Sequence, residues 1–170
     1  MSLHFRPMDE ATTWAIHTWR YELPYDIYNL AAEPAESLVG AFLDPQNAYY
    51  AIRDDEEEVV AYCCFGPDAR VPGGDYGPAA AGEALDVGLG VRPDLTGQGQ
   101  GGGYVQAVLD FARHRWAPAA FRVTVAEFNR RAQRVWEKAG FHQVQRFGRS
   151  TDSMPFVVLV RPAGTAEPLG

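Results

Sequence analysis

The sequence lacks the features of membrane and secreted proteins. The chain has 170 residues, and none of its apolar runs approaches the length of a membrane span. The longest, VVAYCCF at residues 59–65, has the length of a buried strand. The first residues, MSLHFRPMDEA, contain no charged-then-apolar signal and no cleavage site. These absences predict a cytoplasmic protein with no membrane partner.

Cysteine is scarce, and the histidines are dispersed. Cys63 and Cys64 are the two cysteines, and neighbours on a strand point to opposite faces, so no disulfide between them is expected. Both are interpreted as reduced core residues. No cluster of cysteine or aspartate at ligand spacing accompanies the four histidines, so no metal site is expected; the histidines are His4, His17, His114 and His142.

Positive charge is scarce in the first part of the chain. Residues 1–100 hold 5 Lys and Arg against 17 Asp and Glu, a net −12, whereas residues 101–150 hold 9 against 3, a net +6. The total of −7 argues against a nucleic-acid partner. The asymmetry has two interpretations, which stay open here. It could reflect solvated faces, or an anionic ligand held by the second part and a cationic one met by the first.

The length predicts one domain, over residues 1–161, followed by a loose tail at 162–170. A Gly/Pro-rich loop fills residues 66–82, a length typical of functional or mobile loops. Hydrophobic periodicity predicts strands near residues 3–8, 48–54, 58–66, 83–91, 121–128, 141–148 and 154–161, and helices near 9–20, 35–42, 104–112 and 129–140.

Five glycines lie between Gly97 and Gly103, directly before an amphipathic helix. A glycine-rich turn at a helix N-terminus exposes unpaired N–H groups and lets an anion approach the backbone. A flexible turn without a ligand is the alternative, but so many glycines carry a large entropic cost for a mere turn. The pattern therefore favours a phosphate site.

Two phosphate motifs do not fit. A Walker loop requires Gly-Lys-Ser/Thr, which is absent from the sequence. Gly97, Gly99 and Gly102 match the dinucleotide fingerprint, with Glu127 after the next strand. However, four residues, 93–96, separate the preceding strand from the glycines, and only about forty residues follow Glu127. The fingerprint turn starts at the strand end and needs a longer fold after it.

A third motif carries a family resemblance. VRPDLTGQGQGGGYV, followed by VTVAEFNRRAQRVWEKAGF, resembles the GNAT N-acetyltransferase superfamily, and the two blocks span Leu85 to Phe141. That family shows Val-x-Pro, Arg/Gln-x-x-Gly-x-Gly/Ala, Asn-x-x-Ala and Tyr-Glu-Lys-x-Gly-Phe in this order. The resemblance implies an α/β (α+β) GNAT fold, with a mixed, mostly antiparallel sheet of six to seven strands flanked by helices.

The resemblance also implies acetyl-CoA as co-substrate. The backbone of Leu89, Gly90 and Val91 would pair with its pantetheine arm, for which the bare glycine face of this strand leaves room. Asn129 would contact it near the thiol end, although a plain helix cap also explains this residue. The pyrophosphate loop would comprise Thr96, Gly97, Gln98, Gly99, Gln100, Gly101 and Gly102.

Two residues depart from the family pattern. Thr96 stands where the family often has Arg or Gln, which puts one phosphate contact in doubt. Trp136 stands where the family usually has a tyrosine that can protonate the leaving thiolate, and tryptophan cannot do so. Trp136 is expected to pack inward, as a wall near the thiol end.

The implied reaction is direct acetyl transfer to a primary amine, which attacks only when neutral. The site must therefore remove a proton, directly or through water. Asp86 is the first candidate for the base and Glu83 the second. Alternatively, Asp86 is a strand-end carboxylate satisfied by backbone N–H groups.

The acceptor pocket is expected to involve an aromatic segment and the long loop. Its predicted residues are Trp19, Tyr21, Tyr25, Tyr28, Arg70 and Tyr76. For the aromatic residues, core packing is the alternative. The acceptor is a small-molecule or peptide amine of open identity, and a homodimer is also left open.

Two other functions compete with this one. A non-catalytic acyl-CoA sensor, or inactive paralogue of the same fold, is favoured by the tryptophan at position 136. A nicotinamide-dependent enzyme would bind NAD and not CoA.

Overall fold

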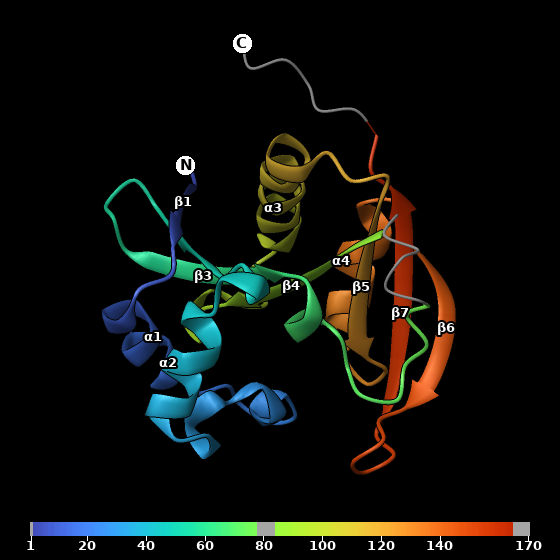
Figure 1. The fold of residues 1–170 in the computed structure, drawn as a ribbon, viewed down its shortest axis with the longest axis horizontal. Coiled ribbons are helices and arrows are strands. Elements are labelled where there is room, and N and C mark those ends of the chain that lie inside the picture. Colours follow the sequence, from blue (N-terminus) through green and yellow to red (C-terminus); the bar gives the residue numbers. More distant parts are fainter. Residues whose placement is uncertain (1, 78–83, 165–170) are drawn as a thin grey trace.

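The computed structural model describes residues 2–77 and 84–164. Four α-helices and seven strands lie in this part of the chain (Figure 1). The helices are α1 (Glu10–His17), α2 (Ala35–Leu43), α3 (Gly101–Trp116) and α4 (Arg130–Lys138). The strands are β1 (His4–Pro7), β2 (Tyr50–Arg53), β3 (Val59–Phe65), β4 (Ala84–Val91), β5 (Ala120–Ala126), β6 (His142–Gly148) and β7 (Pro155–Pro162).

The strands form one sheet of order β1-β2-β3-β4-β5-β7-β6. Every neighbouring pair is antiparallel except β4 and β5, which are parallel. The α3 helix connects these two strands, as a parallel crossover requires. The mixed, mostly antiparallel sheet expected from the sequence is thereby confirmed.

Helices cover both faces of the sheet. In Figure 1, α1 and α2 lie on one side of β3 and β4, and α3 lies on the other. The main core lies on the α3 side and includes Val105, Leu109 and Trp136, while a smaller cluster joins Ile16, Leu38 and Phe42 of α1 and α2. Because side chains alternate along a strand, β3 and β4 contribute to both clusters.

Two helices begin at the caps that the sequence predicts. Asp9 accepts a hydrogen bond from the Thr12 N–H at the start of α1, and Asn129 accepts one from the Ala132 N–H at the start of α4. The α3 helix differs, because no side chain caps its N-terminus at Gln100. Its first N–H groups are therefore left for a ligand or water.

The parallel pair at the centre of the sheet is short. Only Ala84, Leu85 and Asp86 of β4 pair with β5, and the last pair is Asp86 with Arg122. Both strands continue for several residues, β4 to Val91 and β5 to Ala126, but these described residues do not pair with each other. The sheet therefore splits between β4 and β5.

The C-terminal strand extends slightly further than expected. The β7 strand ends at Pro162, and the side chain of Ala163 is fully buried in the main core. Residues 162–164 thus belong to the folded domain, while 165–170 lie outside the described residues. Among the described helices, none has the length and apolar character needed to cross a membrane.

Candidate active site

A cleft of about 660 Å³ opens where the sheet splits. Residues of both separated strands line it, from Val87 to Val91 on β4 and from Val123 to Ala126 on β5. The glycine loop, α3, α4 and the segment between α1 and α2 supply most of the remaining wall, and Tyr62, Ala69, Val71 and Phe156 complete it. The split therefore connects the glycine loop with the face covered by α1 and α2.

The glycine loop lines one end of the cleft. Gly97 and Gly99 have φ values of +72° and +76°, which side chains rarely adopt. A Cβ at Gly102 would meet no atom within 4 Å, so space lies beside the first turn of α3. Of the residues predicted for this loop, Thr96, Gly97, Gly99, Gly101 and Gly102 line the cleft.

The two glutamines of the loop do not line the cleft. Gln98 and Gln100 are both exposed, and the Gln98 amide donates to the Asp94 carbonyl at 2.6 Å. The predicted contact of these two residues with acetyl-CoA therefore has no support from the positions of their side chains.

Arg131 is a cleft residue that the sequence analysis missed. Its Nη1 would lie 2.9 Å from a Cβ at Gly97, and its guanidinium stacks over the Tyr25 ring at 4.2 Å. The guanidinium of Arg131 thus supplies a positive charge beside the glycine loop. Thr96, which stands where the family often has Arg or Gln, supplies none. A cation in the first turn of a helix is unfavourable next to the helix dipole, so an arginine at this position of the sequence could have indicated a binding role.

The open edge of β4 presents backbone groups to the cleft. Asp86 O and Arg92 N bond to β3, so alternation directs the N–H and C=O of Val87, Leu89 and Val91 toward the split. Gly90 lines the cleft, but its backbone polar groups face β3 by the same alternation. The N–H and C=O of Leu89 and the N–H of Val91 are therefore available for strand-like pairing with a ligand, and those of Gly90 are not. The Val91 carbonyl already accepts from the Tyr21 hydroxyl.

Asn129 and Trp136 both line the cleft from α4. The Asn129 side chain caps the helix and also donates from Nδ2 to the Tyr28 hydroxyl at 3.0 Å. Trp136 is 6% exposed and packs edge-on against Phe141, with ring centroids 5.1 Å apart. Its inward packing agrees with the expected role as a wall.

The aromatic segment between α1 and α2 closes the mouth of the split. Tyr21 donates to the Val91 carbonyl at 2.6 Å, at the end of β4, while Tyr28 accepts from Asn129, beyond the end of β5. Tyr25, between them, lies over Arg131. All three tyrosines line the cleft, whereas Trp19 packs on Tyr62 in the smaller cluster, as the core-packing alternative proposes.

The bare glycine face of β4 is filled by neighbouring side chains rather than left for a ligand. A Cβ at Gly88 would lie 2.7 Å from the Cys64 sulfur, and a Cβ at Gly90 would lie 2.4 Å from the Tyr62 ring. The sequence expectation for this face is therefore wrong. The two glycines accommodate residues that face them across the β3–β4 pair.

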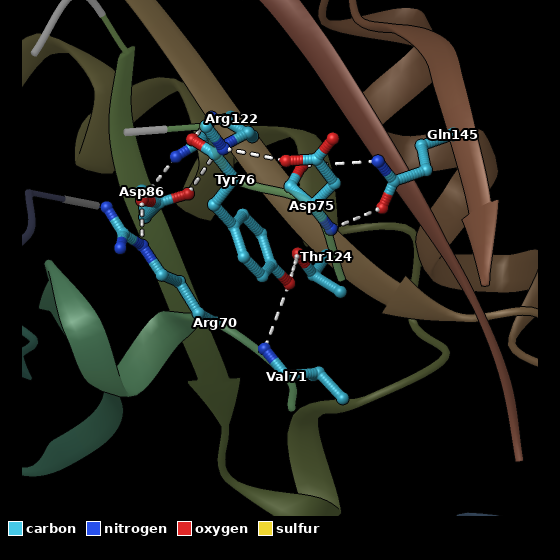
Figure 2. A network of polar contacts seen from close by, with 9 residues as sticks. Arg70, Val71, Asp75, Tyr76, Asp86, Arg122, Thr124 and Gln145 are labelled. Carbon is cyan, nitrogen blue, oxygen red and sulfur yellow. Dashed lines mark hydrogen bonds and ion pairs between the residues drawn. The ribbon is translucent and has the colours of Figure 1, made fainter. Parts of the chain in front are cut away.

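Asp86 lies at the point where the strands separate, and it is 3% exposed. Arg122 donates to both of its oxygens, at 2.6 and 2.8 Å, and Arg70 donates to Oδ2 at 2.8 Å. Figure 2 shows both arginines meeting this carboxylate. The bonds to Asp86 raise the pKa of Arg122. This geometry argues against the general-base role expected for Asp86, because guanidinium groups hold both of its oxygens and the residue does not line the cleft.

Arg70 and Tyr76 anchor the long loop instead of lining the cleft. The Tyr76 hydroxyl accepts from the Val71 N–H at 2.9 Å and bonds to Thr124 at 2.8 Å (Figure 2). The neighbours of Arg70, Ala69 and Val71, do line it. Glu83, the second base candidate, lies outside the described residues.

The charged residues that line the described part of the cleft are Arg131 and Lys138, and no acidic side chain is among them. Part of the acidic surplus lies instead in the β2–β3 turn, where Asp55 pairs with His4 and Glu57 with Arg6. The expectation that acidic residues of the first part meet a cationic acceptor finds no support in this lining.

Solved structures with the same fold are acetyltransferases. A chimera of the Vibrio cholerae spermidine N-acetyltransferase SpeG and hSSAT superimposes with a TM-score of 0.75 at 15% identity, covering 96% of each chain. A protein proposed to be a phosphinothricin N-acetyltransferase gives 0.69 at 20% identity, covering 98% of this chain and all of the other. A GNAT-family acetyltransferase of Bacillus anthracis gives 0.68 at 14%, covering 96% of each chain.

The sequence itself gives a more specific assignment. It matches none of the curated proteins. The sequence model of the Acetyltransferase (GNAT) family matches residues 9–141. This range includes both sequence blocks, the glycine loop and the split between β4 and β5. The chain therefore belongs to the GNAT acetyltransferase family.

Proposed function

We propose that this protein transfers the acetyl group of acetyl-CoA directly to a primary amine. The carrying observation is the split between β4 and β5, which joins a glycine-lined anion site to a tyrosine-lined cavity. A thin ligand lying in the split can expose its reactive end to an acceptor on the α1–α2 face. The similar structures include a spermidine N-acetyltransferase chimera and a protein proposed to be a phosphinothricin N-acetyltransferase, so the fold does not fix the acceptor.

The residues present fit acetyl-CoA. Gly101 and Gly102 offer helix N-terminal N–H groups, and Arg131 adds a cation for the phosphates. Leu89 and Val91 offer backbone groups to the amides of pantetheine. Tyr104, another cleft residue, has a buried hydroxyl with no hydrogen-bond partner among the described residues. Bound acetyl-CoA would supply an activated acyl group, while these residues hold and orient it.

The cleft chemistry favours an acceptor amine of low pKa. None of the described residues that line the cleft is Asp, Glu, His or Cys, so the proton must leave through water. Near pH 7, an α-amino group of pKa about 8 is neutral in roughly one molecule in ten, and a lysine-like amine of pKa about 10.4 in roughly one in 2,500. We therefore propose an α-amine on an uncharged or acidic body rather than a polyamine.

Two measurements test the function. Acetyl-CoA should raise the melting temperature, because a ligand that binds only the folded state stabilises it, whereas NAD should not. An amine panel that pairs spermidine with amino acids and their esters should then release free CoA thiol, most rapidly with the α-amines.

The outcomes separate the competing functions. Stabilisation by acetyl-CoA without thiol release from any amine would favour the non-catalytic sensor. Stabilisation by NAD alone would favour the nicotinamide-dependent enzyme. Spermidine as the best acceptor would retain acetyl transfer and refute the proposed acceptor class.

A further inference from the structure

Tyr62 crosses β4 at Gly90. The two residues face each other across the β3–β4 pair. A Cβ at position 90 would lie 2.4 Å from Cε1, 2.5 Å from Cζ and 2.8 Å from the hydroxyl oxygen of Tyr62. The far end of the phenol, and not its base, therefore rests over Gly90. Because Gly90 has no side chain, the ring can lean from β3 across the next strand.

This crossing brings the Tyr62 hydroxyl to the open edge of β4. Tyr62 lines the cleft together with Leu89, Gly90 and Val91. Leu89 and Val91 direct their backbone groups into the split on either side of Gly90. A ligand that pairs with this edge would pass directly beside the phenol.

The Tyr62 hydroxyl differs from those of Tyr21 and Tyr28 in its hydrogen bonding, and from the unpartnered hydroxyl of Tyr104 in its place, because Tyr104 lies on α3. Tyr21 donates its proton to the Val91 carbonyl, and Tyr28 is held by Asn129 beyond the end of β5. Tyr62 is half-buried, and its hydroxyl forms no hydrogen bond with another described residue. Burial raises the pKa of Tyr62, so its proton is present throughout the neutral range.

A proton donor in this place would assist the reaction. When an amine takes the acetyl group, the sulfur of CoA leaves with the electron pair of the broken C–S bond. Trp136 carries an indole N–H that is not given up in water near neutral pH, and Lys138 and Arg131 lie on α4, across the split from β4. A neutral phenol at the β4 edge can donate to the sulfur as charge develops.

We propose that the Tyr62 hydroxyl protonates the leaving sulfur of CoA, an inference that rests on the proposed acetyl transfer. The acceptor nitrogen forms a C–N bond to the acetyl carbon, the C–S bond breaks, and the Tyr62 proton moves to sulfur. The phenolate then takes the extra proton of the acetylated nitrogen. Tyr62 is thus restored, and no further reactant is needed.

The first test uses binding rather than turnover. With protein in excess over CoA, the ultraviolet absorbance of the thiolate is titrated against pH for the wild type, Tyr62→Phe and Tyr49→Phe. A phenol that donates to sulfur stabilises the thiolate, so the thiol pKa of bound CoA should be about one unit lower in the wild type than in Tyr62→Phe. Tyr49 packs on Tyr62 but does not line the cleft, so Tyr49→Phe should match the wild type.

A second variant guards against a folding defect. Gly90→Ala places a methyl group against the ring of Tyr62 and should raise the bound thiol pKa as Tyr62→Phe does. Gly88→Ala, which presses on Cys64 instead, is its matched control. In single-turnover transfer, Tyr62→Phe should lose roughly 10²-fold or more in rate while acetyl-CoA affinity is retained.

The results distinguish a failure of the role proposed for Tyr62 from a failure of the proposed acetyl transfer. If CoA binds and its thiol titrates identically in the wild type and Tyr62→Phe, the role of Tyr62 is refuted while acetyl transfer stands. A shift of the same size in Tyr49→Phe would also overturn the assignment to Tyr62. If CoA does not bind the wild type, the proposed function fails and this inference fails with it.

Discussion

The amide of Asn129 performs two functions at once: its oxygen caps α4, and its Nδ2 donates to the Tyr28 hydroxyl at 3.0 Å. These two residues are 101 positions apart in the chain. The bond ties the segment before α2 to the end of β5, and with Tyr21 on Val91 it closes the mouth of the split from both strands.

Asn129→Ser should separate capping from ligand contact. Serine caps helices as well as asparagine does, so the cap is kept, but the amide donor is lost. The free energy of unfolding should fall by about 1 kcal/mol for the lost bond to Tyr28. We expect acetyl-CoA affinity to fall by roughly fivefold, about 1 kcal/mol for one hydrogen bond. Asn129→Ala should in addition lose about 1 kcal/mol of stability. Calorimetric titration and denaturant unfolding measure the two effects, and unchanged affinity in both variants would remove Asn129 from the donor site.

Arg131→Gln should weaken acetyl-CoA binding by roughly tenfold, because a charge-assisted contact to phosphate is lost. The salt dependence of binding should also decrease. Arg130→Gln is the matched control, since Arg130 is its exposed neighbour and does not line the cleft. Equal losses in both variants would indicate a general electrostatic effect rather than a contact made by Arg131.

Gly102→Ala and Gly103→Ala form a matched pair in the first turn of α3. A Cβ at either position meets no atom within 4 Å, so both changes should stabilise the helix by about 0.5–1 kcal/mol. Gly102 lines the cleft and Gly103 does not. Only Gly102→Ala should therefore weaken acetyl-CoA binding, as measured by the ligand-induced shift in melting temperature. A loss of the shift in Gly103→Ala alone would place the ligand elsewhere on the helix.

Asp86→Asn tests whether Asp86 anchors Arg122 and Arg70 or acts as the general base. Removing the charge leaves Arg122 and Arg70 without their shared partner, so stability should fall by about 3 kcal/mol. At a temperature where the variant is folded, turnover should stay within roughly tenfold of the wild type from about pH 6 to 9. A general base would instead cost roughly 10² to 10⁴ in turnover. Arg70→Met is the control. It removes only the partly exposed donor to Oδ2 of Asp86, and it shows how turnover responds when the long loop loses this anchor but Asp86 keeps its charge.

Local pattern was sufficient for the order of elements and for the glycine loop. Asp9 and Asn129 predict helix starts because a side-chain oxygen at a cap accepts from the backbone nearby, which is a local interaction. Five glycines before an amphipathic run predict the exposed N-terminus of α3 for the same reason. The strands of the antiparallel sheet also follow from alternation that is visible in the sequence.

The walls of the cleft were decided by contacts that no local pattern contains. Tyr62 reaches the split because Gly90 lies beside it in the sheet. In the sequence the two residues are 28 positions apart, so the glycine gives no sign of the ring that it accommodates. The expected role of Asp86 finds no support in the structure, because parallel pairing sets Arg122 opposite it and the long loop places Arg70 beside it. A sequence determines which residues can cap, turn or alternate, since those interactions span a few positions. Only the tertiary structure decides which charges meet and which hydroxyl is left free, because those partners come from distant segments.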